Sequence, residues 1–250
     1  MFGESEGVIR LLDAEPSLAR GIDRRLLDDA RESLTVEVRK IAPGEWEDAH
    51  KVPPSPLFIG YLILSGAFTR EIQVSGRPSL ELLGPGDLIR PWVVPRALDV
   101  MHVSDEWSLI STGHIAIIGE EVHRQAQDFP SILTVLMDRV VARARWLGFH
   151  VALCQIPRID HRLLLTFRYV AERWGTECPR GVRIPIRLSH RNIAAMIGAR
   201  RPKVSAALTT LAEQGLIEQD KDGTWTFFAA DIDPMAILAG IDDPSEAAAS

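Results

Sequence analysis

Two short helices joined by a glycine turn are predicted after Ser189, and this spacing restricts the fold more than any other feature of the sequence. Ser189 is a good N-cap for a helix over His190–Ile197. Gly198 suits the turn that ends that helix, and Pro202 falls in the first turn of the next one, where its missing N–H is not needed. The second helix repeats apolar residues at spacings of four and three, which predicts its buried face: Val204, Leu208 and Leu211. Together these features predict a helix-turn-helix.

A hairpin is predicted directly after the second helix, with Asp222 and Gly223 at its tip. A helix-turn-helix followed by such a hairpin is a winged helix, whose second helix enters the major groove of DNA. Arg200, Arg201 and Lys203 occupy the first turn of that helix, where arginine can pair with guanine and lysine with phosphate. The alternative is a charged, solvated helix end in an ordinary three-helix core. The cap, the turn, the proline and the hairpin together favour DNA binding.

The candidate DNA-binding residues come from the first helix and its cap, the second helix and the hairpin. We expect the first helix and the hairpin to contact the DNA backbone and the second helix to read bases. The full set is Ser189, His190, Arg191, Arg200, Arg201, Pro202, Lys203, Ser205, Ala206, Lys221 and Thr224.

Charge is distributed unevenly along the chain. The net charge is −6, so the protein as a whole is not a polycation and any nucleic-acid surface must be local. Residues 180–221 hold eight Lys and Arg residues against three acids, whereas residues 231–250 hold five acids and no base. The basic block coincides with the predicted helix-turn-helix.

Residues 34–118 read as many short strands separated by turn residues, which is typical of a small antiparallel barrel or sandwich. The predicted strands are Leu34–Ile41, Ile59–Ser65, Phe68–Val74, Ser79–Leu83, Asp87–Ile89, Leu98–Val103 and Trp107–Ile118. Helical spacing precedes them, first at Val8, Leu11 and Leu12 and then between Ile22 and Ala30. The predicted fold class is therefore α+β.

A long helix is predicted over Ser131–Ile156, which contains no proline. Its apolar residues are spaced as the a and d positions of a coiled coil, and they are Leu133, Met137, Val140, Ala144, Leu147, Val151 and Cys154. Such a seam can pack on its own domain, but its length and continuity favour pairing with a second copy of the chain.

At this point the sequence resembles the Crp/Fnr superfamily of bacterial transcription regulators. The strongest match is GARRPKVSAALTTLAEQGLIE, which is similar to the recognition-helix pattern of that family. Weaker matches are the turns of LILSGAF and LLGPGDL and the pair Arg162-Leu163. The resemblance implies a cyclic-nucleotide-binding-like jelly roll with short flanking helices over residues 1–130 and a dimerisation helix over 131–156. A winged helix-turn-helix over 157–230 and an acidic tail over 231–250 complete it.

The chain departs from the family pattern at its base-reading positions. These match Arg201, Pro202 and Ala206, and only Arg201 keeps a polar side chain. We therefore expect an operator unlike the TGTGA-type half-site that is common in the family, with Arg200 or Lys203 sharing the readout.

The family's nucleotide phosphate cassette is also altered. Arg90-Pro91 stands where that cassette has Gly-Glu, and Arg96-Ala97 is a shortened remnant of its Arg-Ser/Thr pair. These changes argue against cyclic AMP or cyclic GMP as the effector. Arg90, Trp92 and Arg96 could instead hold an anionic or aromatic molecule. The alternative is that Trp92 caps the barrel while the arginines pair with nearby acids.

The sequence gives little support for cofactor chemistry. Cys154 and Cys178 are the only cysteines, too few for an iron–sulfur cluster. Haem needs only one or two axial ligands, and the barrel histidines are His50, His102 and His114. No H-x-H pair suits a cupin-like metal enzyme, and no nucleophile or phosphate-loop motif is present. We expect no cofactor, no metal and no enzymatic activity.

The sequence thus predicts a homodimeric, DNA-binding transcription regulator. Its expected partners are a pseudo-palindromic DNA operator, a second copy of itself, RNA polymerase and an unidentified small effector. A regulator with a vestigial barrel that binds DNA constitutively is the alternative. No secretory signal or membrane span is evident, which predicts a cytoplasmic location.

Overall fold

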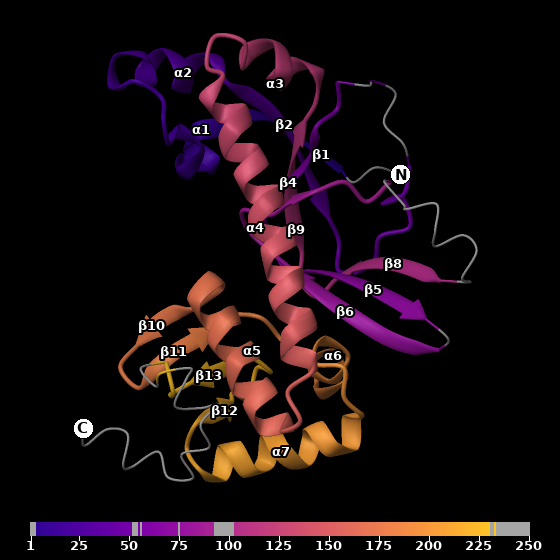
Figure 1. Ribbon diagram of the computed structural model, residues 1–250. Helices are drawn as coiled ribbons and strands as arrows, with labels where there is room; N and C mark the ends of the chain where they lie inside the picture. Colours follow the sequence, from indigo (N-terminus) through magenta and orange to yellow (C-terminus); the bar gives the residue numbers. More distant parts are fainter. Residues whose placement is uncertain are drawn as a thin grey trace. The chain divides into compact units, whose positions relative to one another are not determined.

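The structure is a computed structural model that describes residues 4–51, 55, 57–74, 76–92, 103–230 and 233 (Figure 1). The chain forms two compact units: residues 1–77 with 81–147, and residues 78–80 with 148–250. The mixed α+β class is confirmed. No helix among the described residues is long and apolar enough to cross a membrane.

The first unit is built on two antiparallel sheets. One has the strand order β1-β2-β9-β4-β7, and the other has the order β3-β8-β5-β6. Their bounds are β1 Glu4–Arg10, β2 Thr35–Ile41, β3 Gly44–Glu45, β4 Gly60–Ser65, β5 Phe68–Val74, β6 Arg77–Leu83, β7 Leu88–Ile89, β8 Ser104–Leu109 and β9 Gly113–Ile118. The described strands form two separate sheets, so the predicted barrel is not closed by hydrogen bonds.

The predicted strand Trp107–Ile118 is wrong as one element, because the chain changes sheet in its middle. β8 pairs with β5 in one sheet, and β9 pairs with β4 and β2 in the other. Gly113 begins β9 at a site where a Cβ atom would lie 2.6 Å from the Phe68 ring. Only glycine fits at this corner. Most of the predicted strand Leu98–Val103 lies outside the described residues.

The helical spacing predicted at Val8 is also wrong. Residues 4–10 form β1, which pairs with β2, and Val8 is 67% exposed. Helical structure starts only after Arg10, with α1 Leu11–Ala14, η1 Pro16–Ala19, η2 Arg24–Leu26 and α2 Leu27–Ser33. Pairing with a distant strand overrides the local spacing here.

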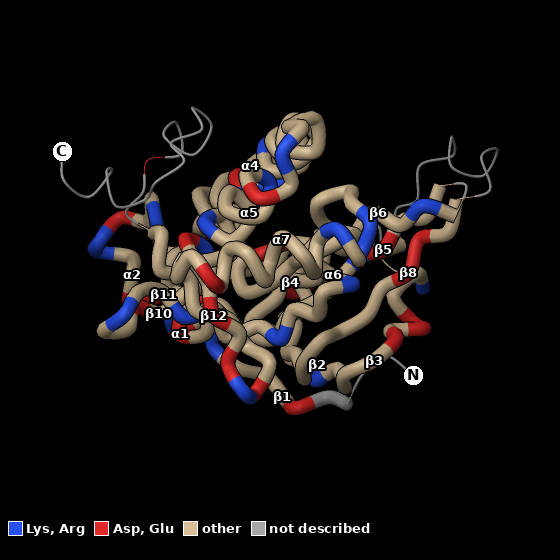
Figure 2. Tube along the Cα trace, turned by 90° about the horizontal axis from the view of Figure 1, so that it is seen from below, with Lys and Arg blue, Asp and Glu red and all other residues tan. Residues whose placement is uncertain are grey.

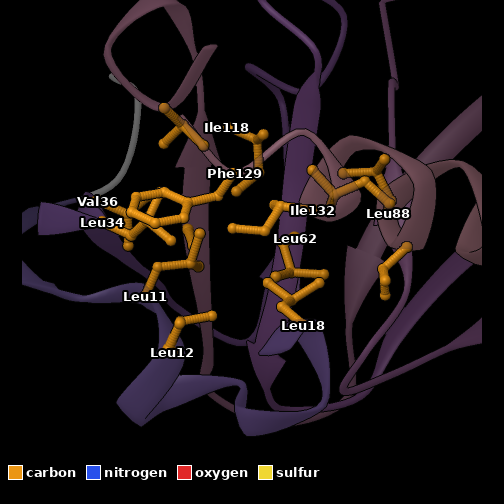
Figure 3. Packing of buried hydrophobic residues seen from close by; sticks show 14 of the residues in the cluster. Leu11, Leu12, Leu18, Leu34, Val36, Leu62, Leu88, Ile118, Phe129 and Ile132 are labelled. Atoms are coloured by element: carbon orange, nitrogen blue, oxygen red, sulfur yellow. The ribbon is translucent and has the colours of Figure 1, made fainter. Parts of the chain in front are cut away.

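The core of the first unit joins these short helices to the sheet (Figure 3). Alternate residues of β2 point inward, as the predicted period of two requires, and Val36 and Val38 are buried. Leu62 from β4 lies within the same cluster, together with Leu11 and Leu18 from the helices.

Helices α3 Glu120–Gln125 and α4 Ser131–Cys154 follow the sheets. Within its first two turns α4 buries Ile132, Val135 and Leu136 in the core of the first unit. Leu133, the first residue of the predicted seam, packs against this core, but most of the seam lies on another face. Met137 is 61% exposed and Val151 is 64% exposed, and Val140 and Leu147 are exposed as well. The chain therefore leaves most of this apolar seam open.

Beyond the end of α4, the described residues of the second unit form three helices and one antiparallel sheet. The helices are α5 Ile159–Trp174, α6 His190–Met196 and α7 Arg201–Glu213. The sheet has the order β10-β11-β13-β12, with bounds Thr176–Cys178, Gly181–Ile184, Trp225–Phe227 and Ile217–Gln219 in that order. Phe167 of α5 packs on the rings of Trp225 and Phe227, which fixes the helix on the sheet.

Removing a fully buried side chain from the first core should destabilise the protein. We expect Leu62→Ala to lower the free energy of unfolding by about 2–5 kcal/mol, because it deletes buried methyl groups and leaves a cavity. Leu26→Ala is the matched control, since Leu26 is 44% exposed. Urea denaturation should show little change for Leu26→Ala, and an equal loss for both variants would contradict this account of the core.

Candidate nucleic-acid interface

Helix α6 begins with a reciprocal cap, as the sequence predicts. The Asn192 backbone N–H donates to Ser189 Oγ at 3.1 Å, and the Ser189 N–H donates to Asn192 Oδ1 at 3.2 Å. Two N–H groups that the helix cannot satisfy itself thus find partners. This fixes the first residue of α6 at His190.

The turn between α6 and α7 is stabilised by a glycine and by hydrogen bonds from two side chains. Gly198 has φ +63°, a conformation that glycine adopts without strain. The last carbonyl groups of α6 accept from two side chains: His150 donates to Met196 O, and Arg162 Nη1 donates to Ile197 O at 3.1 Å. The sequence motif found the glycine, but it gave no sign of His150.

Helix α7 buries one apolar face and carries its cations in its first turn. Val204, Leu208 and Leu211 are each at most 2% exposed, which confirms the predicted inward face. Proline stands in the first turn, as predicted. Three cations at the start of the helix are exposed and form no ion pair within the described part of the chain: Arg200, Arg201 and Lys203. Figure 2 shows Lys and Arg at the end of α7 that adjoins α6.

Two of the candidate residues hold the motif together. His190 Nδ1 lies 2.9 Å from Ser205 Oγ, so the first residue of α6 is bonded to the middle of α7. The His190 ring also lies 6.0 Å from the Trp225 ring of β13. His190 and Ser205 are partly buried, whereas Arg191, Pro202 and Ala206 are exposed.

The wing differs from the expectation at Thr224. Its side chain is 6% exposed, and its hydroxyl donates to Asp222 Oδ1 at 2.6 Å. Thr224 therefore shapes the turn instead of facing outward. The Thr224 backbone N–H also donates to Asp222 Oδ1, at 3.0 Å. These two hydrogen bonds, with the nearby Arg183 guanidinium, lower the pKa of Asp222 below its usual value. Lys221 at the tip is exposed.

Some cations of the basic block at residues 180–221 are paired with acids in the folded chain. Arg180 pairs with Glu218 at 3.2 Å, and Arg183 pairs with Asp222 at 2.8 Å, so acids of the hairpin neutralise these two cations. Arg187 is exposed beside the wing, 3.8 Å from where a Cβ of Gly223 would lie. Arg187 belongs to the basic block of residues 180–221, but no sequence motif at this position indicates a role for it.

The candidate effector residues lie in the first unit. Trp92 packs edge-on against Phe58 and Tyr61 at 5.1 and 5.2 Å, as a cap on the aromatic core would. Arg90 stacks on Trp92 at 5.7 Å and donates weakly to Phe58 O, and no acid among the described residues forms an ion pair with it. Burial raises the pKa of Tyr61. Arg96 lies outside the described residues.

The described barrel histidines have both ring nitrogens in contact with the protein. His50 faces Pro91 O and Asp105 O at 3.0 and 2.8 Å. His114 faces Ser65 Oγ at 2.8 Å and Glu6 at 3.1 Å. Axial ligation of haem by either side chain would require breaking one of these contacts. His102 lies outside the described residues.

Comparison with known proteins identifies the second unit. Residues 158–228 match the family model of the Crp-like helix-turn-helix domain. A search of curated protein sequences gives no match.

Solved structures match most of the chain. A mutant of CooA from Carboxydothermus hydrogenoformans has a TM-score of 0.59 and 14% identity, covering 89% of this chain and 93% of that one. FixK2 from Bradyrhizobium japonicum has a TM-score of 0.58 and 15% identity, covering 82% and 96%. A CRP/FNR-family transcriptional regulator from Thermus thermophilus has a TM-score of 0.56 and 15% identity, covering 81% and 98%.

The solved structures therefore share the fold of most of this chain, from the sheets of the first unit to the winged helix of the second. Residues 158–228 are thus similar to the Crp-like helix-turn-helix domain, in the part of the chain where the sequence predicts a winged helix-turn-helix.

Loss of the α6 cap should destabilise the helix-turn-helix domain. Ser189→Ala leaves the Asn192 N–H without its acceptor, and we expect a loss of about 1 kcal/mol in the free energy of unfolding. Ser189→Thr keeps the hydroxyl and is the control. Denaturant melts of the two variants should differ, and equal melts would show that the cap contributes nothing.

Proposed function

We propose that the protein is a homodimeric, sequence-specific DNA-binding transcription regulator that does not respond to cyclic AMP. The observation that carries this proposal is the segregation of faces on α7. Three buried apolar residues turn Arg200, Arg201 and Lys203 outward at the start of the helix. In a winged helix this end of the recognition helix meets base edges.

The exposed residues at the start of α7 differ in whether they can form hydrogen bonds to bases. Arg201 can form two hydrogen bonds to guanine O6 and N7, which discriminates by about 1–3 kcal/mol against other bases. Pro202 and Ala206 are exposed but offer only apolar contact, for instance with a thymine methyl group. Readout therefore concentrates on Arg201, with Arg200 and Lys203 beside it.

The open seam of α4 supports homodimerisation. An apolar stripe at coiled-coil spacing that stays exposed in one chain is stabilised when a second copy covers it. A two-fold dimer would present two recognition helices about 34 Å apart to a pseudo-palindromic operator. A transcription regulator of this kind is also expected to interact with RNA polymerase and to be located in the cytoplasm.

The proposed effector is a small molecule that binds to the first unit and is not a cyclic nucleotide. Arg90-Pro91 lacks the carboxylate that the family's cassette offers to a ribose. Arg90 stacked on Trp92 provides a cation and an aromatic face for an anionic or aromatic ligand. The alternative is a constitutive regulator, in which the packing of Trp92 on Phe58 and Tyr61 serves only to cap the core.

Selection of operators from a random duplex pool tests DNA recognition. We expect the ligand-free dimer to enrich an inverted repeat. Arg201→Ala should lose discrimination at one position of each half-site, whereas Lys203→Ala should weaken binding to every sequence and lower the salt slope by about one per contact. Unchanged operator binding by Arg201→Ala would overturn the placement of α7 in the groove.

Substitution in the seam tests the dimer. Val140→Asp places a charge in the proposed interface, and sedimentation velocity should show dissociation to monomers at micromolar concentration. Ala142→Asp is the control, because Ala142 is exposed on α4 outside the a and d positions. A monomeric wild type, or equal behaviour of both variants, would contradict the α4 interface.

A further inference from the structure

We propose that His190 is a proton-linked contact to the DNA backbone. In its protonated form Nδ1–H donates to Ser205 Oγ and Nε2–H donates to a backbone phosphate, so that DNA affinity rises as the pH falls. The inference deepens the proposed function and rests on it.

Three elements fix the His190 ring. It is the first residue of α6, its Nδ1 lies 2.9 Å from Ser205 Oγ of α7, and its ring lies 6.0 Å from that of Trp225 in β13. Trp225 is itself held, because its indole N–H donates to Leu188 O at 2.9 Å. A side chain held in this way loses little rotamer freedom on binding a ligand.

The other ring nitrogen is available to a partner. The His190 side chain is only partly buried, and Nε2 makes no hydrogen bond within the described ranges of the chain. His190 sits between Ser189 and Arg191, at the start of a helix that lies on the DNA backbone in helix-turn-helix complexes. A phosphate oxygen is an acceptor that suits this nitrogen.

Ser205 makes the internal bond insensitive to protonation. A hydroxyl both donates and accepts, so the bond to Nδ1 persists whether the imidazole is neutral or charged. Protonation therefore changes only the outer edge of the ring, where Nε2 becomes a charged donor. His50 is the contrast: its two nitrogens face two carbonyl oxygens, and a neutral ring can donate to only one of them.

The surrounding charges link protonation to DNA binding. His190 contacts α7 and β13, and the cations on α6 and α7 are Arg191, Arg201 and Lys203, whereas β13 carries none. The wing acids are engaged with the wing itself, since Asp222 accepts from Thr224 and pairs with Arg183, and Asp220 accepts from Thr226. Within the described residues no acid pairs with His190. A phosphate oxygen at Nε2 favours the protonated ring, so protonation and DNA binding promote each other.

Binding at two pH values tests this linkage. The probe is a duplex of roughly 30 base pairs, which spans two half-sites one helical turn apart. We expect the wild-type Kd from fluorescence anisotropy to be roughly three- to tenfold lower near pH 6 than near pH 8, because histidine titrates in this range. His190→Gln should abolish the difference. His123→Gln on α3 is the matched control and should keep it.

Calorimetry of the wild type gives an answer that does not depend on the variant folding. Titrations near pH 7 in two buffers of different ionisation enthalpy should show proton uptake on DNA binding. A pH-independent Kd, a pH effect that persists in folded His190→Gln, or no proton uptake would overturn the role of His190. Failure to bind any duplex at either pH would instead overturn the proposed function, and this inference with it.

Discussion

Burial of one face of α7 is the constraint on which the helix-turn-helix unit depends. Val204, Leu208 and Leu211 are removed from water almost completely, and each contributes about 1.5–3 kcal/mol of transfer free energy. A helix has a fixed period, so fixing this face also fixes the opposite one. The outward position of Arg201 and Lys203 is therefore a consequence of core packing, and it needs no specific contact of their own.

The same principle gives α4 two roles. Its first turns bury Ile132, Val135 and Leu136 in the first unit, while a second stripe, which includes Met137 and Val151, stays exposed. A coiled-coil spacing predicts the second stripe directly. It cannot predict the first, because those residues are buried by the sheet and by helices that lie far away in sequence.

Sequence predicted the helix-turn-helix well because its determinants are local. The Ser189 cap, Gly198 and Pro202 each act within a few residues of their own position, and all are found where expected. Prediction failed where distant pairing decides. β1 is a strand because β2 lies beside it, and the division of Trp107–Ile118 depends on two different sheets. The burial of Thr224 is not evident from the sequence either, because hydrogen bonding within the turn determines which side chain faces outward.

The wing acids shape the electrostatics of the proposed interface. Arg180 and Arg183 would extend a basic surface along the sheet, but Glu218 and Asp222 neutralise them. The remaining positive charge lies at the start of α7, at Arg187 and at Lys221 in the wing tip. A protein of net charge −6 gains little from long-range attraction to DNA, so its affinity must come from these few short-range contacts. One additional proton at His190 is then a substantial part of the local positive charge. The proposed binding surface is therefore more sensitive to pH than the surface of a strongly basic protein would be.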